Sequence, residues 1–180
     1  MHTLIVVGSR RNGNSLKLAK TLKNELEKNR IIGKIIVPGN QKIYLCTGCM
    51  DCDTNGTCDF NDDMNNNIDL INKTDSIIFI SPTRWNTISG DLKIFMDRLN
   101  QLYTTEWLKN KKAIIIAIGS KGKEEFSTNG AIHSIDNFCE SAKMNVIYKG
   151  QFNDCLFAND INKYNEKIKT MTKRITTLLS

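Results

Sequence analysis

Four of the six cysteines in this chain of 180 residues lie close together, at Cys46, Cys49, Cys52 and Cys58. Their spacing, C-x2-C-x2-C-x5-C, places four potential thiolate ligands in one short segment. Zinc sites usually take their ligands from two chain segments separated by about a dozen residues or more, whereas compact runs of cysteines are typical of iron–sulfur clusters. The spacing therefore favours an iron–sulfur cluster, with a zinc site or four free thiols as the alternatives.

The other two cysteines and the N-terminal sequence indicate whether the protein lies in a reducing or an oxidising compartment. Cys139 and Cys155 stand alone in the sequence and are predicted to be small, buried apolar side chains. The first apolar run is too short for a signal peptide, and no stretch approaches the ~20 apolar residues of a membrane span. We therefore expect a cytoplasmic protein without membrane association, in which cysteine clusters serve metal or redox chemistry instead of disulfides.

A polar, basic loop over residues 8–15 follows the first apolar run. The residues suited to an anion are two glycines that allow close backbone approach (Gly8, Gly13), three donors (Ser9, Asn14, Ser15) and a positive charge from Arg10 or Arg11. Since a helix is expected to begin near residue 15, its positive end would face the loop, which predicts a phosphate site. The loop matches neither the Walker nor the GxGxxG pattern, so a nucleoside triphosphate or NAD bound in the Rossmann manner is disfavoured. The alternative is an ordinary capped turn.

Two further loops have the chemistry to hold a flat heterocycle. The first contains a rigid proline, an aromatic ring and polar donors, in the order Pro82, Thr83, Arg84, Trp85 and Asn86. The second, after another apolar run, has small residues with accessible backbone donors at Gly119, Ser120 and Gly122. The alternative for Trp85 is a place in the core.

The elements that position these loops alternate along the chain. Apolar runs predict strands at 3–7, 34–37, 76–80, 113–118 and 145–149, and helical periodicity predicts helices at 15–29, 61–73, 89–103, 129–143 and 160–178. This alternation is typical of an α/β domain with a doubly wound, five-stranded parallel sheet and helices on both faces. Such sheets bind ligands at the carboxyl ends of their strands, where the three loops would meet.

The domain organisation and the remaining charges follow from the same pattern. We expect a single domain over residues 1–180, with the cysteines on an insertion at about 44–60, called the cysteine segment below. Asp62 and Asp63 are expected to open the next helix, and Asp97 and Arg98 to form a structural pair or an interface contact. The formal charge of +6 is a mild excess that does not indicate nucleic-acid binding.

Three phrases in the sequence resemble a known family. Residues 8–15 (GSRRNGNS), 81–86 (SPTRWN) and 89–99 (SGDLKIFMDRL) look like the NADPH-dependent FMN reductases, and the cysteine segment is similar to that of their relatives, the iron–sulfur flavoproteins. The resemblance implies a flavodoxin-like sheet, FMN at the carboxyl ends of the strands, a 4Fe–4S cluster on the four cysteines, and a homodimer or homotetramer.

The resemblance also implies roles for particular residues. The FMN phosphate would be held by Ser9, Arg11, Asn14 and Ser15. The isoalloxazine would be bordered by Pro82, Thr83, Trp85 and Asn86, with Ser120 and Gly122 near its other side. Arg84 is added to the predicted cofactor residues, because an arginine can stack on a ring or stabilise the negative charge of a reduced flavin. The family usually has a tyrosine two positions after the proline, where this sequence has Arg84, and this departure bears on the local geometry. No side-chain acid or base is required, so no catalytic residue is assigned.

The predicted function is an oxidoreductase that transfers electrons between FMN and a 4Fe–4S cluster. Its expected partners are a ferredoxin-like electron carrier or NAD(P)H, and a small acceptor such as a quinone or oxygen. The alternatives are an NAD(P)H-dependent FMN or quinone reductase without a cluster, and a flavodoxin-like carrier with a structural zinc.

Overall fold

The structure, a computed structural model, describes residues 1–120 and 127–180. Within these residues, five parallel strands form one sheet in the order β2-β1-β3-β4-β5. The strands are β1 (His2–Val7), β2 (Ile32–Ile36), β3 (Ser76–Pro82), β4 (Lys112–Ile118) and β5 (Asn145–Phe152). This is the flavodoxin-like order of a doubly wound sheet, so the predicted fold class is confirmed.

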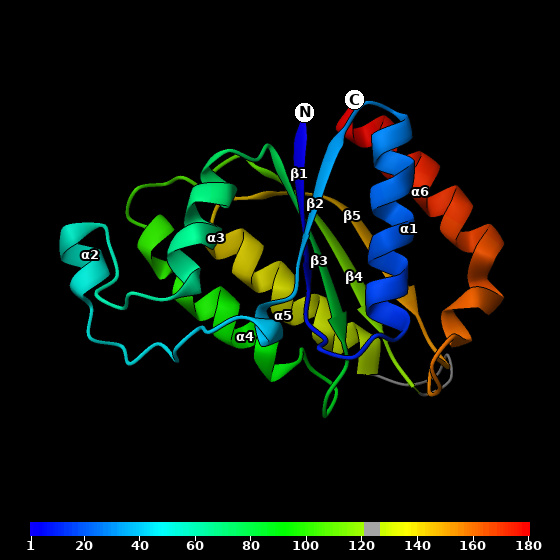
Figure 1. Ribbon diagram of the computed structural model, residues 1–180, viewed down its shortest axis with the longest axis horizontal. Helices are drawn as coiled ribbons and strands as arrows, with labels where there is room; N and C mark the ends of the chain where they lie inside the picture. Colours follow the sequence, from blue (N-terminus) through cyan, green and yellow to red (C-terminus); the bar gives the residue numbers. More distant parts are fainter. Residues whose placement is uncertain (121–126) are drawn as a thin grey trace.

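Two helical layers cover the sheet (Figure 1). One layer consists of α3 (Asp63–Asn72), α4 (Gly90–Asp97) and α5 (Ser127–Ser141), and the other of α1 (Asn14–Lys28) and α6 (Asn165–Leu179). Successive residues of each strand point to opposite layers: Leu4 and Val6 pack with the first layer, whereas Ile5 and Val7 pack with the second. Among the described residues, no helix combines the length and apolar character needed to cross a membrane.

Several predicted boundaries differ from the observed ones. The strand predicted at 34–37 begins at Ile32, whose side chain is exposed, because β2 is an edge strand and pairing with β1 fixes its register. The helix predicted at 89–103 is α4 followed by the tighter 3-10 helix η2 (Arg98–Leu102). The predicted C-terminal helix likewise starts as η3 (Asp160–Tyr164) before α6.

Two short helices were not predicted from the sequence. One is η1 (Pro38–Asn40), and the other is α2 (Asp51–Asn55), which lies inside the cysteine segment. The five residues of α2 have no buried side chain and therefore no apolar periodicity to read. Left-handed residues flank this helix, Met50 at φ +67° and Gly56 at φ +71°. Figure 1 shows α2 standing apart from the sheet, outside the layer of α3 and α4.

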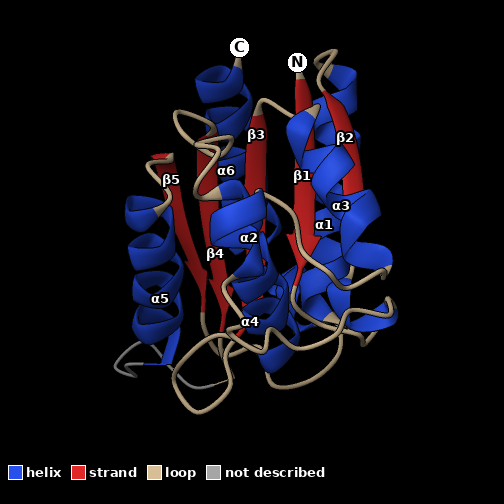
Figure 2. Ribbon diagram, turned by 90° about the vertical axis from the view of Figure 1, so that its left-hand side faces the viewer, coloured by secondary structure: helices blue, strands red, loops and turns tan. Residues whose placement is uncertain are grey.

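The carboxyl ends of β1 and β3 lie side by side where the direction of the sheet's winding reverses. Gly8 closes β1 here, and its N–H donates to the Ile80 carbonyl at 2.9 Å. A Cβ at Gly8 would lie only 2.6 Å from Oγ of Ser89, the residue that caps α4, so this position requires glycine. Figure 2 shows the loops after the strands gathered at this end of the molecule. The fold thus brings the predicted phosphate and ring loops to one edge.

Candidate functional site

The loop over residues 8–15 presents the start of α1 at the carboxyl edge of the sheet. The N-cap is Gly13, with extended backbone and no side-chain hydrogen bond to the helix in the described part of the chain. The first N–H groups of a helix have no partner within it, so these donors are available to an anion. The Ser9 and Ser15 side chains lie largely buried against the fold in the same loop. The arrangement fits a phosphate group.

The two arginines of this loop have different surroundings. Arg10 forms a forked ion pair with Asp91 at the start of α4, with Nε–Oδ2 at 3.0 Å and NH2–Oδ1 at 2.7 Å. The hydrogen bond and the charge of Asp91 raise the pKa of Arg10. Gly39 packs against this ion pair: a Cβ built at Gly39 would lie 2.4 Å from Oδ2 of Asp91. Arg10 is therefore engaged by α4, whereas the side chain of Arg11 extends into solvent.

Asn14 has a structural role that the sequence did not reveal. Its amide nitrogen donates to the carbonyls of Phe157 at 2.9 Å and Cys155 at 3.3 Å, and its oxygen accepts from the N–H of Ile161 at 3.2 Å. The side chain thus ties the start of α1 to the loop before η3. Its predicted contact with a phosphate stays a prediction.

The loop after β3 is a tight hairpin. Arg84 and Thr87 exchange two backbone hydrogen bonds of 2.9 and 3.0 Å. The two residues between them have positive φ, +47° at Trp85 and +60° at Asn86, as a type I′ turn requires. Positive φ is uncommon for a bulky aromatic residue. Trp85 is 99% exposed, which excludes the alternative that it belongs to the core.

This hairpin is fixed against α5. The Ser127 hydroxyl donates to Oγ1 of Thr83 at 2.7 Å, and the hydroxyls of Thr87 and Ser134 lie 3.0 Å apart. The sequence predicts the loop but not these contacts, which join residues about 45 positions apart. The position of the predicted ring-binding residues therefore depends on α5.

The third predicted loop is only partly described. Gly119 follows β4 and bonds through its N–H to the Phe152 carbonyl at 2.8 Å, which aligns the end of β4 with β5. Ser120 is exposed at the same edge. Gly122, also predicted to border the ring, lies outside the described residues.

The cysteine segment carries its four thiols as free cysteines. Cys46 and Cys49 are exposed, and Cys52 and Cys58 are half-buried. The donor set has the chemistry of an iron–sulfur or zinc site. Across residues 1–120 and 127–180, however, no three or more potential ligands are gathered at metal-holding distance. The residues present fit a thiolate-bound group by identity, while the side chains are not arranged as a coordination shell.

The expectation that Asp97 and Arg98 form a structural pair is wrong. Asp97 pairs with Lys93 one turn earlier on α4, whereas Arg98 pairs with Asp62, the N-cap of α3. Adjacent residues near the end of a helix point in different directions, so these two side chains reach different neighbours. The prediction that Asp62 opens a helix is confirmed, since its carboxylate accepts from the Met64 N–H at 2.9 Å.

The two isolated cysteines are buried, as predicted. Cys139 on α5 is fully enclosed, and burial raises the pKa of its thiol to about 12. Burial likewise raises the pKa of Cys155 to about 11. Both thiols are therefore protonated near neutral pH and poor nucleophiles.

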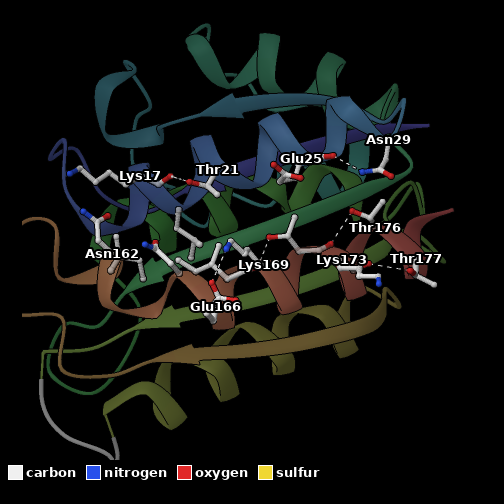
Figure 3. A pocket seen from close by; sticks show the side chains of 15 residues that line it. Lys17, Thr21, Glu25, Asn29, Asn162, Glu166, Lys169, Lys173, Thr176 and Thr177 are labelled. Carbon is white, nitrogen blue, oxygen red and sulfur yellow. Dashed lines mark hydrogen bonds and ion pairs between the residues drawn. The ribbon is translucent and has the colours of Figure 1, made fainter.

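Grooves also lie elsewhere on the described part of the molecule. A groove of about 780 Å³ runs between α1 and α6 (Figure 3) and is lined by none of the predicted cofactor residues. Lys169 and Glu166 pair with each other at 2.7 Å, and several threonines there bond to their own helix. A second groove of about 710 Å³ lies between Cys46–Gly48 and the side chains of α4, η2 and α5. Neither groove is lined by residues of the three predicted cofactor loops, which follow β1, β3 and β4.

The strand order and the covering helices define a flavodoxin-like protein, with the polar loops gathered at the carboxyl edge of its sheet. Residues 1–158 match the sequence model of the family described as NADPH-dependent FMN reductase, and the chain belongs to that family. The predicted family is therefore confirmed.

Two curated proteins are similar to this chain in sequence. The chain is 30% identical over 127 residues to an iron–sulfur flavoprotein of Archaeoglobus fulgidus, covering 69% of this chain and 58% of that protein. It is 29% identical over 139 residues to the iron–sulfur flavoprotein MJ1083 of Methanocaldococcus jannaschii, covering 77% of this chain and 71% of that protein. The matched region thus spans less than two thirds of the first relative.

Solved structures share the fold at low sequence identity. A flavone reductase superimposes with a TM-score of 0.75 at 16% identity, over 97% of this chain and 60% of that one. An NAD(P)H:quinone oxidoreductase from Methanothermobacter marburgensis superimposes with a TM-score of 0.71 at 16% identity, over 100% and 99% of the two chains. These similarities support the flavodoxin-like architecture.

Proposed function

We propose that this protein is an iron–sulfur flavoprotein that transfers electrons between FMN, bound at the carboxyl edge of the sheet, and a 4Fe–4S cluster on Cys46, Cys49, Cys52 and Cys58. The observation that carries the proposal is the presence of all four cysteines in one anchored segment of a chain from the FMN reductase family. The curated relatives named iron–sulfur flavoproteins support the same function.

The proposed FMN site rests on the start of α1 and the hairpin after β3. Ser9, Arg11 and Ser15, with the first N–H groups of α1, would hold the phosphate, because the uncapped helix end attracts an anion. Asn14 would contribute its backbone N–H, since its side chain bonds to the loop before η3. The isoalloxazine would be bordered by Pro82, Thr83, Arg84, Trp85 and Asn86, with Ser120 and Gly122 on the other side.

The proposed cluster site uses the four thiols as ligands. When bound, FMN supplies two-electron chemistry that can be divided into single-electron steps, and a 4Fe–4S cluster supplies one-electron transfer. The chain's own residues then bind and orient these groups: left-handed Gly48, Met50 and Gly56 turn the backbone between the cysteines. We assign no side chain as an acid or base.

The proposed partners follow from this role. A ferredoxin-like carrier or NAD(P)H would supply electrons, and a quinone or oxygen would accept them. The exposed lysines of η3 and α6, including Lys163, Lys167 and Lys169, would suit an acidic carrier. We further propose a homodimer or homotetramer in the reducing cytoplasm, where the four thiols remain available.

A second candidate is an NAD(P)H-dependent FMN or quinone reductase that holds no cluster. It is favoured by one observation, that the four thiols in the described structure are not gathered into a coordination shell. In this case the four cysteines would be free thiols.

Visible absorbance of anaerobically purified protein separates these functions. The proposed protein should show flavin bands together with a broader visible absorption that bleaches on reduction. Cys49→Ser should lose the broader absorption and keep the flavin bands, because Cys49 is exposed and distant in the chain from the phosphate loop. Cys155→Ser is the matched control, a cysteine outside the ligand set, and should keep both features. Identical flavin-only spectra for all three proteins would contradict the cluster and favour the reductase.

A further inference from the structure

A buried ion pair lies at the base of the cysteine segment. The Arg98 guanidinium, at the start of η2, donates through NH1 to Oδ2 of Asp62 at 2.6 Å and through NH2 to Oδ1 at 3.2 Å. The exposed fractions of the two side chains are only 1% and 0%. A forked pair of this kind fixes the orientation of both groups as well as their separation.

The same pair contacts both ends of the cysteine segment. At its start, the Tyr44 N–H donates to Oδ2 of Asp62 at 2.8 Å, and the Tyr44 carbonyl accepts from NH1 of Arg98 at 2.9 Å. At its end, the Phe60 ring lies under the Arg98 guanidinium, 5.0 Å from ring centre to Cζ. The Tyr44 and Phe60 rings pack together at 5.5 Å. Arg98 therefore joins the two ends of the segment.

The middle of the segment is held from the same 3-10 helix. The amide nitrogen of Asn100 donates to Oδ1 of Asp53 at 2.8 Å and contacts the sulfur of Cys52 at 3.3 Å. Asn100 lies two residues after Arg98, so η2 supports both the ends and the centre of the segment. Without these contacts, an exposed segment with few buried apolar side chains would have little to fix its position.

Burying the charges of Arg98 and Asp62 carries a desolvation penalty. Burial lowers the pKa of Arg98, but the hydrogen bond to Asp62 and the charges of Cys58 and Asp62 outweigh it and raise the pKa above its ordinary value. Apolar side chains of similar size often replace a buried ion pair without loss of stability. The distinctive property of Arg98 is thus that one planar group reaches a carboxylate, a backbone carbonyl and an aromatic ring together.

We propose that Arg98 is a positioning residue for the cysteine segment, holding its two ends together so that the four thiols can converge on one group. The role toward a 4Fe–4S cluster rests on the proposed function. The contacts of Arg98 with Asp62, Tyr44 and Phe60, called the clamp below, do not rest on the proposed function, because they join protein groups that need no cofactor.

Limited proteolysis tests the clamp directly. Chymotrypsin cleaves after large apolar residues, and the segment exposes Tyr44, Leu45 and Met50. Trp85, Trp107 and Phe157 are exposed elsewhere and serve as internal reference sites. The double variant Arg98→Met/Asp62→Asn removes both charges together, so neither remains buried alone. We expect cleavage in the segment to rise about tenfold or more relative to the reference sites, because each lost hydrogen bond to a charged group has roughly this effect on local opening.

Two further variants exclude a general loss of stability. Lys93→Ala removes the exposed ion pair with Asp97 on α4 and should leave the cleavage pattern unchanged. Arg98→Lys keeps the charge but loses the fork, and should protect the segment only in part. Unchanged cleavage in the double variant, an equal rise at all sites, or full protection by Arg98→Lys would each overturn the proposal.

Iron content separates this inference from the proposed function. If the wild-type protein purified anaerobically contains iron, the double variant should contain several-fold less iron per chain while retaining FMN. Equal iron in the two proteins would contradict the positioning role toward the cluster. Absence of iron from the wild type would contradict the proposed function instead, and the proteolysis result would still decide whether Arg98 holds the segment.

Discussion

Gly130 on α5 lies where any side chain would strike the Asn86 carbonyl oxygen: a Cβ built at Gly130 would be 2.0 Å from that atom. The missing side chain lets the hairpin after β3 sit directly on the helix. Asn86 itself has a positive φ of +60°, so the tip of the hairpin has little freedom to move aside. The position of the proposed ring-binding loop therefore depends on a glycine about 45 residues away in the sequence.

Gly130→Ala should displace the hairpin. We expect it to lower the free energy of unfolding by about 1–3 kcal/mol through overpacking, which exceeds the gain of about 0.5–1 kcal/mol from helix propensity. Affinities for FMN and riboflavin should fall together, because the loop would border the ring that both share. Flavin fluorescence titration and denaturant unfolding measure the two effects. Gly90→Ala, where a Cβ meets open space, is the control and should leave both flavin affinities intact.

Ser15→Ala together with Arg11→Met should weaken FMN but not riboflavin. Each charged contact to a phosphate contributes about 1.5–3 kcal/mol, so an affinity loss of at least about tenfold is expected for FMN. The same titration with riboflavin isolates the phosphate contribution. Lys20→Met, an exposed change on α1, should leave both affinities unchanged. Equal losses for the two flavins would show that the phosphate lies elsewhere.

Asn14→Ala should act mainly on stability. Its side chain makes three hydrogen bonds to residues 155–161. Their loss leaves the part-buried Cys155 carbonyl and Ile161 N–H unpaired, at a cost of about 1–3 kcal/mol. Denaturant unfolding of the flavin-free protein should show this loss, whereas Ser15→Ala should not. Equal stability of the Asn14→Ala variant and the wild type would contradict the structural role.

The sequence was sufficient to predict the sheet and the edge on which the site lies. The apolar runs that form β1 and β3 stop at Gly8 and Pro82, and both runs are strands in the structure. The three loops follow β1, β3 and β4, so parallel winding alone brings them together. The burial of Cys139 and Cys155 also agreed with expectation.

Contacts between residues far apart in the sequence could not be predicted from the local pattern of residue types. The sequence predicts a structural pair or an interface contact for Asp97 and Arg98. The pair is not formed, because adjacency in sequence does not determine the direction of each side chain at the end of a helix. The actual partner of Arg98, Asp62, is 36 positions away. The exposed, left-handed Trp85 and the engagement of Asn14 also depend on packing against α5 and η3. These are tertiary contacts, which local propensity does not encode.

The buried thiol of Cys139 predicts a pH dependence. Its pKa is raised to about 12 by burial, with a smaller effect from the charge of Asp136, whereas an unfolded thiol ionises near about 8.5. Between these values only the unfolded state releases the proton, so the free energy of unfolding should fall as pH rises, by up to about 1.4 kcal/mol per pH unit. Cys139→Ala should show a shallower decline above about pH 8.5 in denaturant unfolding. Parallel curves for the two proteins would contradict the raised pKa.

The iron, zinc and FMN contents of the anaerobically purified wild-type protein test the central claim most directly. The proposed function predicts about four irons for each bound FMN and no stoichiometric zinc. Protein that contains FMN but only zinc, or no metal at all, would contradict the cluster and leave a flavin reductase of the same fold.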